Sequence, residues 1–356
     1  MIREIQALRA IAILMVLFVH CGALLPEKYH KDIFFIQNIF FTSTGVELFF
    51  ILAGYFLMSS LSKFEKKEDI PTNLNNLAFF IIKKFKRLAP VTYFWVFISL
   101  LFSFLSVHTE GVTLWQSPDI VVKKFFSTLI FLRNFTEAVD PSWLGIYWAV
   151  SLEFQTFLII TVIYFLFGHR AVLFSSLFFI LLMTNYRFGG GMAWLFRFDP
   201  ILLGIILFYF IENLRKDLFH KLFQATLFNK ILISFFLILI LSSSFKVFSN
   251  YPNFNITISS LIACFMALLA FSNNGYFYID IKYINNIIDW LASRSYSLYC
   301  CHIVVWFIVR QFFIFLEIEI NLNFSFVAFV SMLFFTEFSY RYIENILIKK
   351  VPRITK

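Results

Sequence analysis

Charged residues are scarce in this chain, and their scarcity excludes most classes of protein. Only 14% of the 356 residues are charged, whereas 60% are hydrophobic and 21% are aromatic, and the mean hydropathy is +0.81. A water-soluble domain carries roughly 25% charged residues, so an ordinary soluble domain is excluded. The composition predicts an all-α integral membrane protein that crosses the bilayer many times.

Cysteine is also scarce, and the sequence lacks the patterns that hold metals or bind nucleic acid. The four cysteines lie in apolar stretches without metal-ligand spacing or a disulfide framework: Cys21, Cys264, Cys300 and Cys301. We therefore expect free, buried thiols and no bound metal. The net charge of +9 indicates an affinity for anionic lipid or an anionic ligand on one face, and no nucleic-acid partner.

Apolar stretches long enough to cross about 30 Å of hydrocarbon recur along the chain. They predict a bundle of about ten transmembrane helices, near residues 5–25, 38–61, 89–107, 144–167, 171–187, 193–211, 230–248, 256–273, 295–316 and 324–345. The sequence shows no internal repeat and no soluble domain. We expect one transmembrane domain, 1–345, followed by a short basic tail, 346–356.

The distribution of basic residues predicts the orientation of this bundle. With the N-terminus inside, 21 of the 30 Lys and Arg residues fall on the cytoplasmic side, as the positive-inside rule requires. Both termini are then cytoplasmic. Between the spans, an outer segment, 108–142, contains an apolar piece, 125–132, that is too short to cross and predicts a re-entrant or interface-lying helix.

Arg9 and His20 are unusual polar residues in the first apolar stretch. Eleven positions on an α-helix amount to about 1100°, so the two side chains are predicted to share one face, with His20 about 16 Å beyond Arg9. An ionised side chain in a bilayer helix costs about 2.5–3.5 kcal/mol on insertion scales. Such a pair therefore indicates a function.

Two carboxylates lie in other apolar stretches. Glu47 is flanked by Gly45 and Gly54, which are typical of close helix packing, and it is interpreted as pairing with a neighbouring cation. Glu153 needs a cationic or hydrogen-bonding partner, for which Arg9 and His20 are candidates. Glu153 is then either a structural ion-pair partner of Arg9 or a carboxylate that orients an imidazole.

The remaining polar clusters each allow a structural and a functional interpretation. His302 shares a predicted helix face with Ser295, Tyr296 and Tyr299, and it is either a packing residue or part of a site. Lys84 and Arg87 are either ordinary interface anchors or a phosphate clamp. Two further clusters are interpreted as local ion pairs: Arg197 with Asp199, and Glu337, Arg341 and Glu344 at helical spacing.

These residues together resemble a family, the type 3 membrane acyltransferases. Arg9 and His20 are similar to its arginine and histidine in the first helix, and Gly45–Tyr55 (GVELFFILAGY) to its aromatic second helix. Three later elements also occur in the family's order: Lys84–Arg87 (KFKR), Trp148–Phe157 (WAVSLEFQTF), and Ser295–Val304 (SYSLYCCHIV). The chain departs from the pattern at Glu47, Ala53, Lys84, Ala149 and Val304.

The resemblance implies an enzyme of the bacterial cytoplasmic (inner) membrane. It implies transfer of an acyl group, most commonly acetyl from acetyl-CoA, to a sugar hydroxyl of a cell-surface polysaccharide such as lipopolysaccharide O-antigen, capsule or exopolysaccharide. The acceptor is a carbohydrate or lipid-linked glycan, membrane lipid surrounds the protein, and acyl-CoA is a substrate, so no cofactor is expected to stay bound.

The resemblance also assigns roles to single residues. His20 is expected to act as the base, because imidazole is the side chain whose ordinary pKa lies nearest neutrality, and Glu153 to orient it. Donor binding is expected from Arg9, Lys84 and Arg87, and substrate or structural support from Glu47, Ser151, Tyr296 and His302.

Two other classes of protein explain the intramembrane charges. A proton-coupled secondary transporter would use Arg9, His20, Glu47 and Glu153 as a relay, but it predicts paired halves with Gly- or Pro-broken helices, which the sequence lacks. The second class is a structural, non-enzymatic subunit of a protein assembly in the cell envelope. Consumption of a thioester donor discriminates the enzyme from both.

Overall fold

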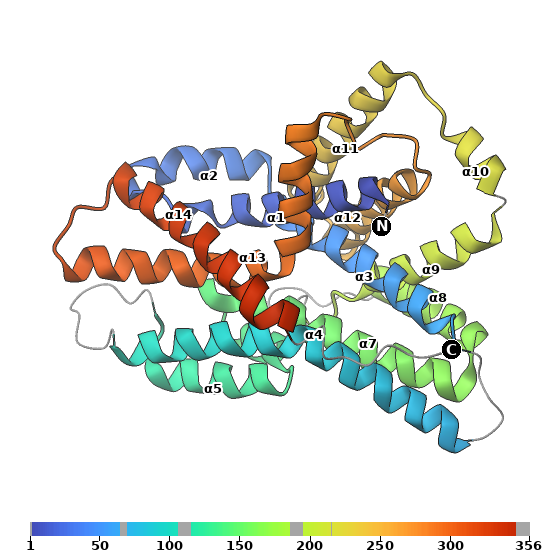
Figure 1. Cartoon of the computed structure of the whole chain (residues 1–356), viewed down its shortest axis with the longest axis horizontal. Helices are drawn as coiled ribbons and strands as arrows, with labels where there is room; N and C mark the ends of the chain where they lie inside the picture. The colour runs from blue at the N-terminus through green and yellow to red at the C-terminus, as the bar shows by residue number, and fades with distance from the viewer. Residues whose placement is uncertain (1, 65–69, 106–114, 186–194, 215, 347–356) are drawn as a thin grey trace. The chain divides into compact units, whose positions relative to one another are not determined.

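The computed structural model describes residues 2–64, 70–105, 115–185, 195–214 and 216–346. In these ranges the chain is helical and contains no β-strand. The helices shown in Figure 1 are α1 (Arg3–Val19), α2 (His30–Ile39), α3 (Gly45–Leu61), α4 (Ile70–Leu105), α5 (Pro118–Leu129), α6 (Arg133–Val139), α7 (Tyr147–Phe167), α8 (His169–Asn185), α9 (Asp199–Asn213), α10 (Lys216–Leu222), α11 (Leu227–Val247), α12 (Pro252–Phe271), α13 (Lys282–Phe315) and α14 (Leu322–Phe338).

The predicted all-α membrane architecture is confirmed. Each of the ten predicted stretches overlaps a helix, and seven described segments are long and apolar enough to cross a membrane. Three of the helices at the ten predicted stretches are not among these seven segments: α1 and α8, with 17 residues each, and α9, with 15. The chain is thus a multi-pass membrane protein. Ten crossings and cytoplasmic termini stay predictions, and the predicted tail beyond Ile346 lies outside the described residues.

The first helix is shorter than predicted. It ends at Val19, and His20 begins a turn (φ −99°, ψ 1°) that leads into a 3-10 helix at Cys21–Ala23. The prediction of a helix over 5–25, with Arg9 and His20 on one helical face, is therefore wrong at its C-terminal end. Gly22 and Pro26 follow closely, and both residue types favour the end of a helix.

The apolar piece at 125–132 falls at the junction of two short helices. α5 begins with Pro118 at its first position, where the missing N–H costs no hydrogen bond, and α6 begins at Arg133. Between them Phe131 adopts φ +55°. Of the predicted piece only residues 125–129 are helical, as the end of α5, so the prediction of a helix is confirmed in that part alone. Its depth in the membrane stays a prediction.

The chain divides into two compact units. Unit 1 comprises Met1–Val19, Ile36–Leu77 and Thr156–Ser295, and unit 2 comprises His20–Phe35, Ala78–Gln155 and Tyr296–Lys356. In unit 1 the backbones of α3 and α9 touch: a Cβ atom at Gly54 would lie 1.9 Å from the Ile201 carbonyl oxygen, and one at Gly204 would lie 2.1 Å from that of Ile51.

Gly45 makes a similar contact with α1, where a Cβ atom would lie 2.6 Å from the Ala12 carbonyl oxygen. The interpretation of Gly45 and Gly54 as close-packing positions is confirmed.

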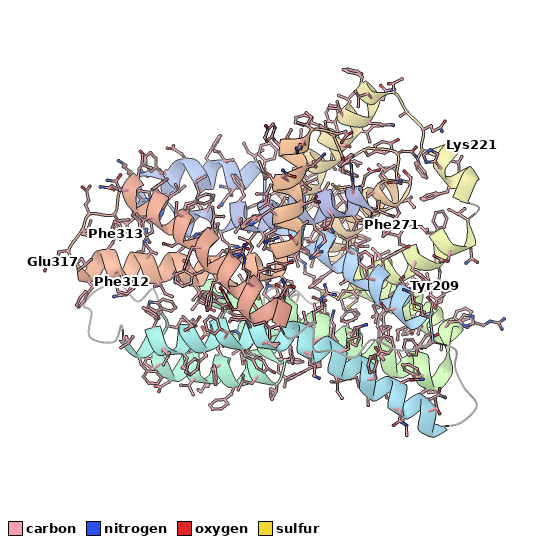
Figure 2. The ribbon with its side chains drawn as sticks, viewed as in Figure 1. Tyr209, Lys221, Phe271, Phe312, Phe313 and Glu317 are labelled. Carbon is pink, nitrogen blue, oxygen red and sulfur yellow. The ribbon has the colours of Figure 1, made fainter. Side chains whose placement is uncertain are left out.

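Farther along α3, Tyr55 stacks on Phe271, with ring centroids 3.9 Å apart. Figure 2 labels Phe271 and also Tyr209, whose hydroxyl donates to the His169 carbonyl at 2.9 Å.

We expect Gly54→Ala to destabilise unit 1. The added methyl group meets backbone rather than a flexible side chain, so the helices must separate, at a cost of about 1–3 kcal/mol. Thermal unfolding of the purified protein in detergent checks this. Gly22→Ala is the control, because a Cβ atom there meets nothing within 4 Å. Equal melting temperatures for both variants would contradict the prediction.

In unit 2, hydroxyl groups and an indole join helices across the core. Trp95 of α4 donates to Ser339 at 3.0 Å, and Tyr147 of α7 donates to the Cys300 carbonyl at 2.8 Å. Ser339 opens a π-helical turn, Ser339–Glu344. The predicted Glu337–Arg341 pair is confirmed at 2.5 Å, whereas Glu344 accepts a hydrogen bond from Ser297 of α13 at 2.7 Å.

Candidate functional site

Two histidines from distant parts of the sequence meet in unit 2. Nδ1 of His20 lies 3.3 Å from Nε2 of His302, and the ring centroids are 5.2 Å apart at an interplanar angle of 47°. His20 is partly exposed in the turn after α1, whereas His302 is completely buried in α13. The first and last elements of the family resemblance therefore supply one imidazole pair.

The backbone of α13 holds the His302 ring from its other side. Nδ1 lies 3.0 Å from the Leu298 carbonyl oxygen and 2.9 Å from that of Tyr299. Trp306, one turn further along, packs edge-on against the ring at 5.3 Å between centroids. The Nδ1 atom of the buried His302 ring thus faces two backbone carbonyl oxygens.

The other residues of the predicted α13 face serve different neighbours. Tyr296 donates to the Leu88 carbonyl at 2.6 Å and lies 2.7 Å from the Thr92 hydroxyl, on the turn of α4 that contains Pro90. Tyr299 donates to the Ile146 carbonyl at 2.5 Å. Tyr296 is therefore a support residue between α13 and α4, and its distance from the imidazole pair along the helix is six positions.

Glu153 of α7 forms an ion pair with Lys84 of α4. The side chains are only 22% and 10% exposed, so both charges are largely removed from water. Glu153 was expected to pair with Arg9 or His20, and the structure places Lys84 at its carboxylate instead. Arg87, one turn later on α4, is exposed, so the two residues of the expected clamp face different surroundings.

Ser151 and Gln155 of α7 support the junction between α5 and α6. The Arg133 backbone N–H donates to Ser151 Oγ at 3.2 Å. Gln155 and Asn134 exchange amide hydrogen bonds of 2.8 and 3.1 Å, and Gln155 also donates to the Phe131 carbonyl at 2.5 Å. Ser151 thus has a structural role here, and these bonds hold Phe131 in its left-handed conformation.

A buried charge cluster in α5 and α6 was not found from the sequence. Glu137 lies between Arg133, with Nε at 2.8 Å, and Lys124, with Nζ at 3.4 Å, and all three residues are buried. Burial lowers the pKa of Lys124 and of Arg133, and the Glu137 carboxylate opposes that shift in both. The four-residue spacing of Arg133 and Glu137 was the available signal.

Two polar contacts in unit 1 involve predicted site residues. Arg9 of α1 donates to Ser295 of α13 at 2.9 Å. Glu47 of α3 accepts from Nε of Arg197 at 2.7 Å, and both side chains are essentially inaccessible to water. The expected cation partner of Glu47 is therefore Arg197. Arg197 thus reaches across to α3, and its local pairing with Asp199 stays a prediction.

Glu4 is a further unit 1 residue that the sequence did not indicate. Its carboxylate accepts three backbone N–H groups, from Gly275, Tyr276 and Phe277, at 2.7 to 3.1 Å. Gly275 has φ +81°, which a side chain disfavours. These bonds fix the N-terminal end of α1 to the loop after α12.

A comparison with protein families decides the class of the chain. The model Acyl_transf_3, described as an acyltransferase domain, matches residues 2–337. The chain belongs to the type 3 membrane acyltransferase family. No curated protein and no solved structure matches this acyltransferase. Membership supports an acyltransferase enzyme and does not favour the transporter interpretation.

Among the described residues, no three His, Cys, Asp or Glu side chains gather in a way that could hold a metal ion. Within the imidazole pair, His20 is the group better suited to proton transfer, because it is partly exposed whereas His302 is completely buried. The buried pairs Lys84–Glu153 and Glu47–Arg197 are arranged as ion pairs within their own units.

Proposed function

We propose that the protein is an acyl-CoA-dependent O-acyltransferase, specifically an O-acetyltransferase, of the bacterial inner membrane. Its acceptor is a sugar hydroxyl of a cell-surface polysaccharide: lipopolysaccharide O-antigen, capsule or exopolysaccharide. The observation that carries the proposal is the partly exposed imidazole of His20, held by His302, in a chain of an acyltransferase family.

In the proposed reaction His20 is the general base. It takes the proton from the sugar hydroxyl while the hydroxyl oxygen attacks the thioester carbonyl carbon. The new C–O bond forms, the C–S bond breaks, and the proton passes from His20 to the leaving thiolate, which departs as free coenzyme A. Proton, acyl group and leaving group are then all accounted for without a further reactant.

The donor site is proposed on the cytoplasmic side. Arg87 is exposed in the middle of α4, just before the predicted span 89–107 on its inner side, and Lys83 and Lys86 beside it are exposed as well. Guanidinium and ammonium groups that lie this close together in the sequence are suited to bind the phosphates of coenzyme A. Lys84 forms an ion pair with Glu153 and so fixes this part of α4 rather than binding the donor directly. Arg9 is proposed as a further donor-binding residue.

The direct test uses purified protein in lipid nanodiscs with acetyl-labelled acetyl-CoA and a lipid-linked glycan. We expect label in the glycan and one free coenzyme A thiol for each acetyl group transferred. Alkaline hydrolysis should release the label, as an ester requires. If solute crosses a vesicle membrane while the thioester stays intact, the proposal is wrong and a transporter is indicated.

We expect Arg87→Gln to raise KM for acetyl-CoA about 10-fold or more with little change in kcat, because a hydrogen bond to a charged group contributes about 1.5–3 kcal/mol. Initial rates at varied donor concentration check this. Lys31→Gln is the control, since Lys31 is an exposed cation of α2 on the predicted opposite side. An unchanged KM in Arg87→Gln contradicts the proposed donor contact.

A further inference from the structure

We propose that His302 sets the tautomer of His20, so that Nε2 of His20 is the nitrogen that takes the proton. The tautomer itself is inferred from hydrogen-bond geometry. The role of Nε2 as the base rests on the proposed function. It makes His302 a positioning residue, a role that the sequence resemblance assigned only as general support.

The first step concerns Nδ1 of His302. This atom lies within 3.0 Å of two carbonyl oxygens, those of Leu298 and Tyr299. A carbonyl oxygen only accepts hydrogen bonds, so Nδ1 must carry a hydrogen and donate it. The reversed ring orientation would place carbon against both carbonyls and lose these bonds.

The second step concerns the charge of His302. Its side chain is completely buried, and its described polar partners are the two carbonyls and His20. No carboxylate is among them, and an imidazolium buried without a counter-charge costs several kcal/mol. The ring is therefore neutral. Because a neutral imidazole carries one hydrogen, and Nδ1 has it, Nε2 of His302 has a lone pair.

The third step concerns the hydrogen on Nδ1 of His20. Nε2 of His302 can only accept, and its neighbour at 3.3 Å is Nδ1 of His20. Nδ1 of His20 must then carry a hydrogen, which leaves Nε2 of His20 with the lone pair. The arrangement does what a carboxylate does in a serine–histidine–aspartate triad, where it holds the imidazole in the productive tautomer. Here a neutral group performs that task.

The tautomer can be tested without any measurement of activity. Nitrogen-15 NMR of histidine-labelled protein in nanodiscs distinguishes protonated from unprotonated ring nitrogens, and His20→Gln and His302→Gln assign the two signals. We expect hydrogen on Nδ1 and a lone pair on Nε2 in both rings. At a pH where the ring is neutral, hydrogen on Nε2 of His20 with none on Nδ1 overturns the inference, even when acyl transfer itself is demonstrated.

Two substitutions of His302 separate positioning from packing. Glutamine puts an oxygen near the place of Nε2 and can accept from His20, whereas asparagine reaches only to the place of Nδ1. We expect His302→Gln to keep kcat within about 10-fold and His302→Asn to lose about 100-fold, within the range for general base catalysis, with similar KM values.

Cys301→Ser is the matched control on α13. Cys301 is buried beside His302, but its sulfur faces the Thr336 hydroxyl at 3.1 Å, so we expect unchanged kcat. Equal losses in the glutamine and asparagine variants would show that His302 acts by packing alone and would overturn the positioning role. The NMR measurement on the unchanged protein still decides the matter if either variant fails to fold.

Discussion

Replacement of His20 by alanine is expected to abolish acyl transfer while the protein remains folded. General base catalysis by a positioned side chain contributes about 10² to 10⁴ in rate, and the loss here should be at least 10³-fold because the variant also loses the group that returns the proton to the thiolate. His20 lies in a turn and is partly exposed, so its removal leaves no large buried cavity.

The measurement is label transfer from acetyl-CoA to glycan, with size-exclusion behaviour and melting temperature recorded for the same samples. His30→Ala is the matched control. His30 is also in unit 2 and partly exposed, and its ring bonds to the Leu25 carbonyl at 3.2 Å. Full activity in His20→Ala would refute the assignment of His20 as the base.

The second large effect is expected in the stability of unit 1 when Glu47 is replaced by alanine. The substitution removes the Glu47 carboxylate from the buried Arg197 guanidinium, and the loss of one member of a buried pair costs about 3–5 kcal/mol. The side chains of Glu47 and Arg197 are 0% and 1% exposed, so water cannot replace the missing partner. We expect a much lower melting temperature or failure to accumulate in the membrane.

A double substitution tests this explanation. Glu47→Leu combined with Arg197→Met removes both charges and keeps the volume, and it should recover most of the lost stability. Glu337→Ala is the control, because its partner Arg341 is exposed and water screens the pair, so we expect little change. A double variant as unstable as Glu47→Ala would show that the charges themselves are not responsible.

The helices were largely predictable because their signal is local. Apolar runs of sufficient length mark α3, α4, α7 and α11 to α14 directly. The end of α1 was missed because the apolar pattern continues past Val19, and only Gly22 and Pro26 oppose it. The close contact at Gly54 could be predicted from its residue type, whereas its partner Gly204 could not, because no local pattern identifies which helix approaches.

The site residues were found more easily than their partners. Glu47 and Glu153 are conspicuous as carboxylates in apolar helices, but a single sequence does not say which distant cation reaches them. His302 was recognised with the late element, and its contact with His20 depends on tertiary packing across 282 positions. Glu4 gave no signal, because an acidic residue in a first helical turn is ordinary.

The pairing of Glu47 with Arg197 also has a consequence for the order of biosynthesis. The two residues are separated by 150 positions in the chain. At a synthesis rate of about 5–20 residues per second, α3 exists for roughly 8–30 s before Arg197 is made. During this interval Glu47 and the bare backbone at Gly54 lack their final neighbours, so α3 must wait at the insertion machinery or beside other helices. The last segment of unit 1 to be synthesised, Thr156–Ser295, thus completes the packing of the earlier segment that contains α3.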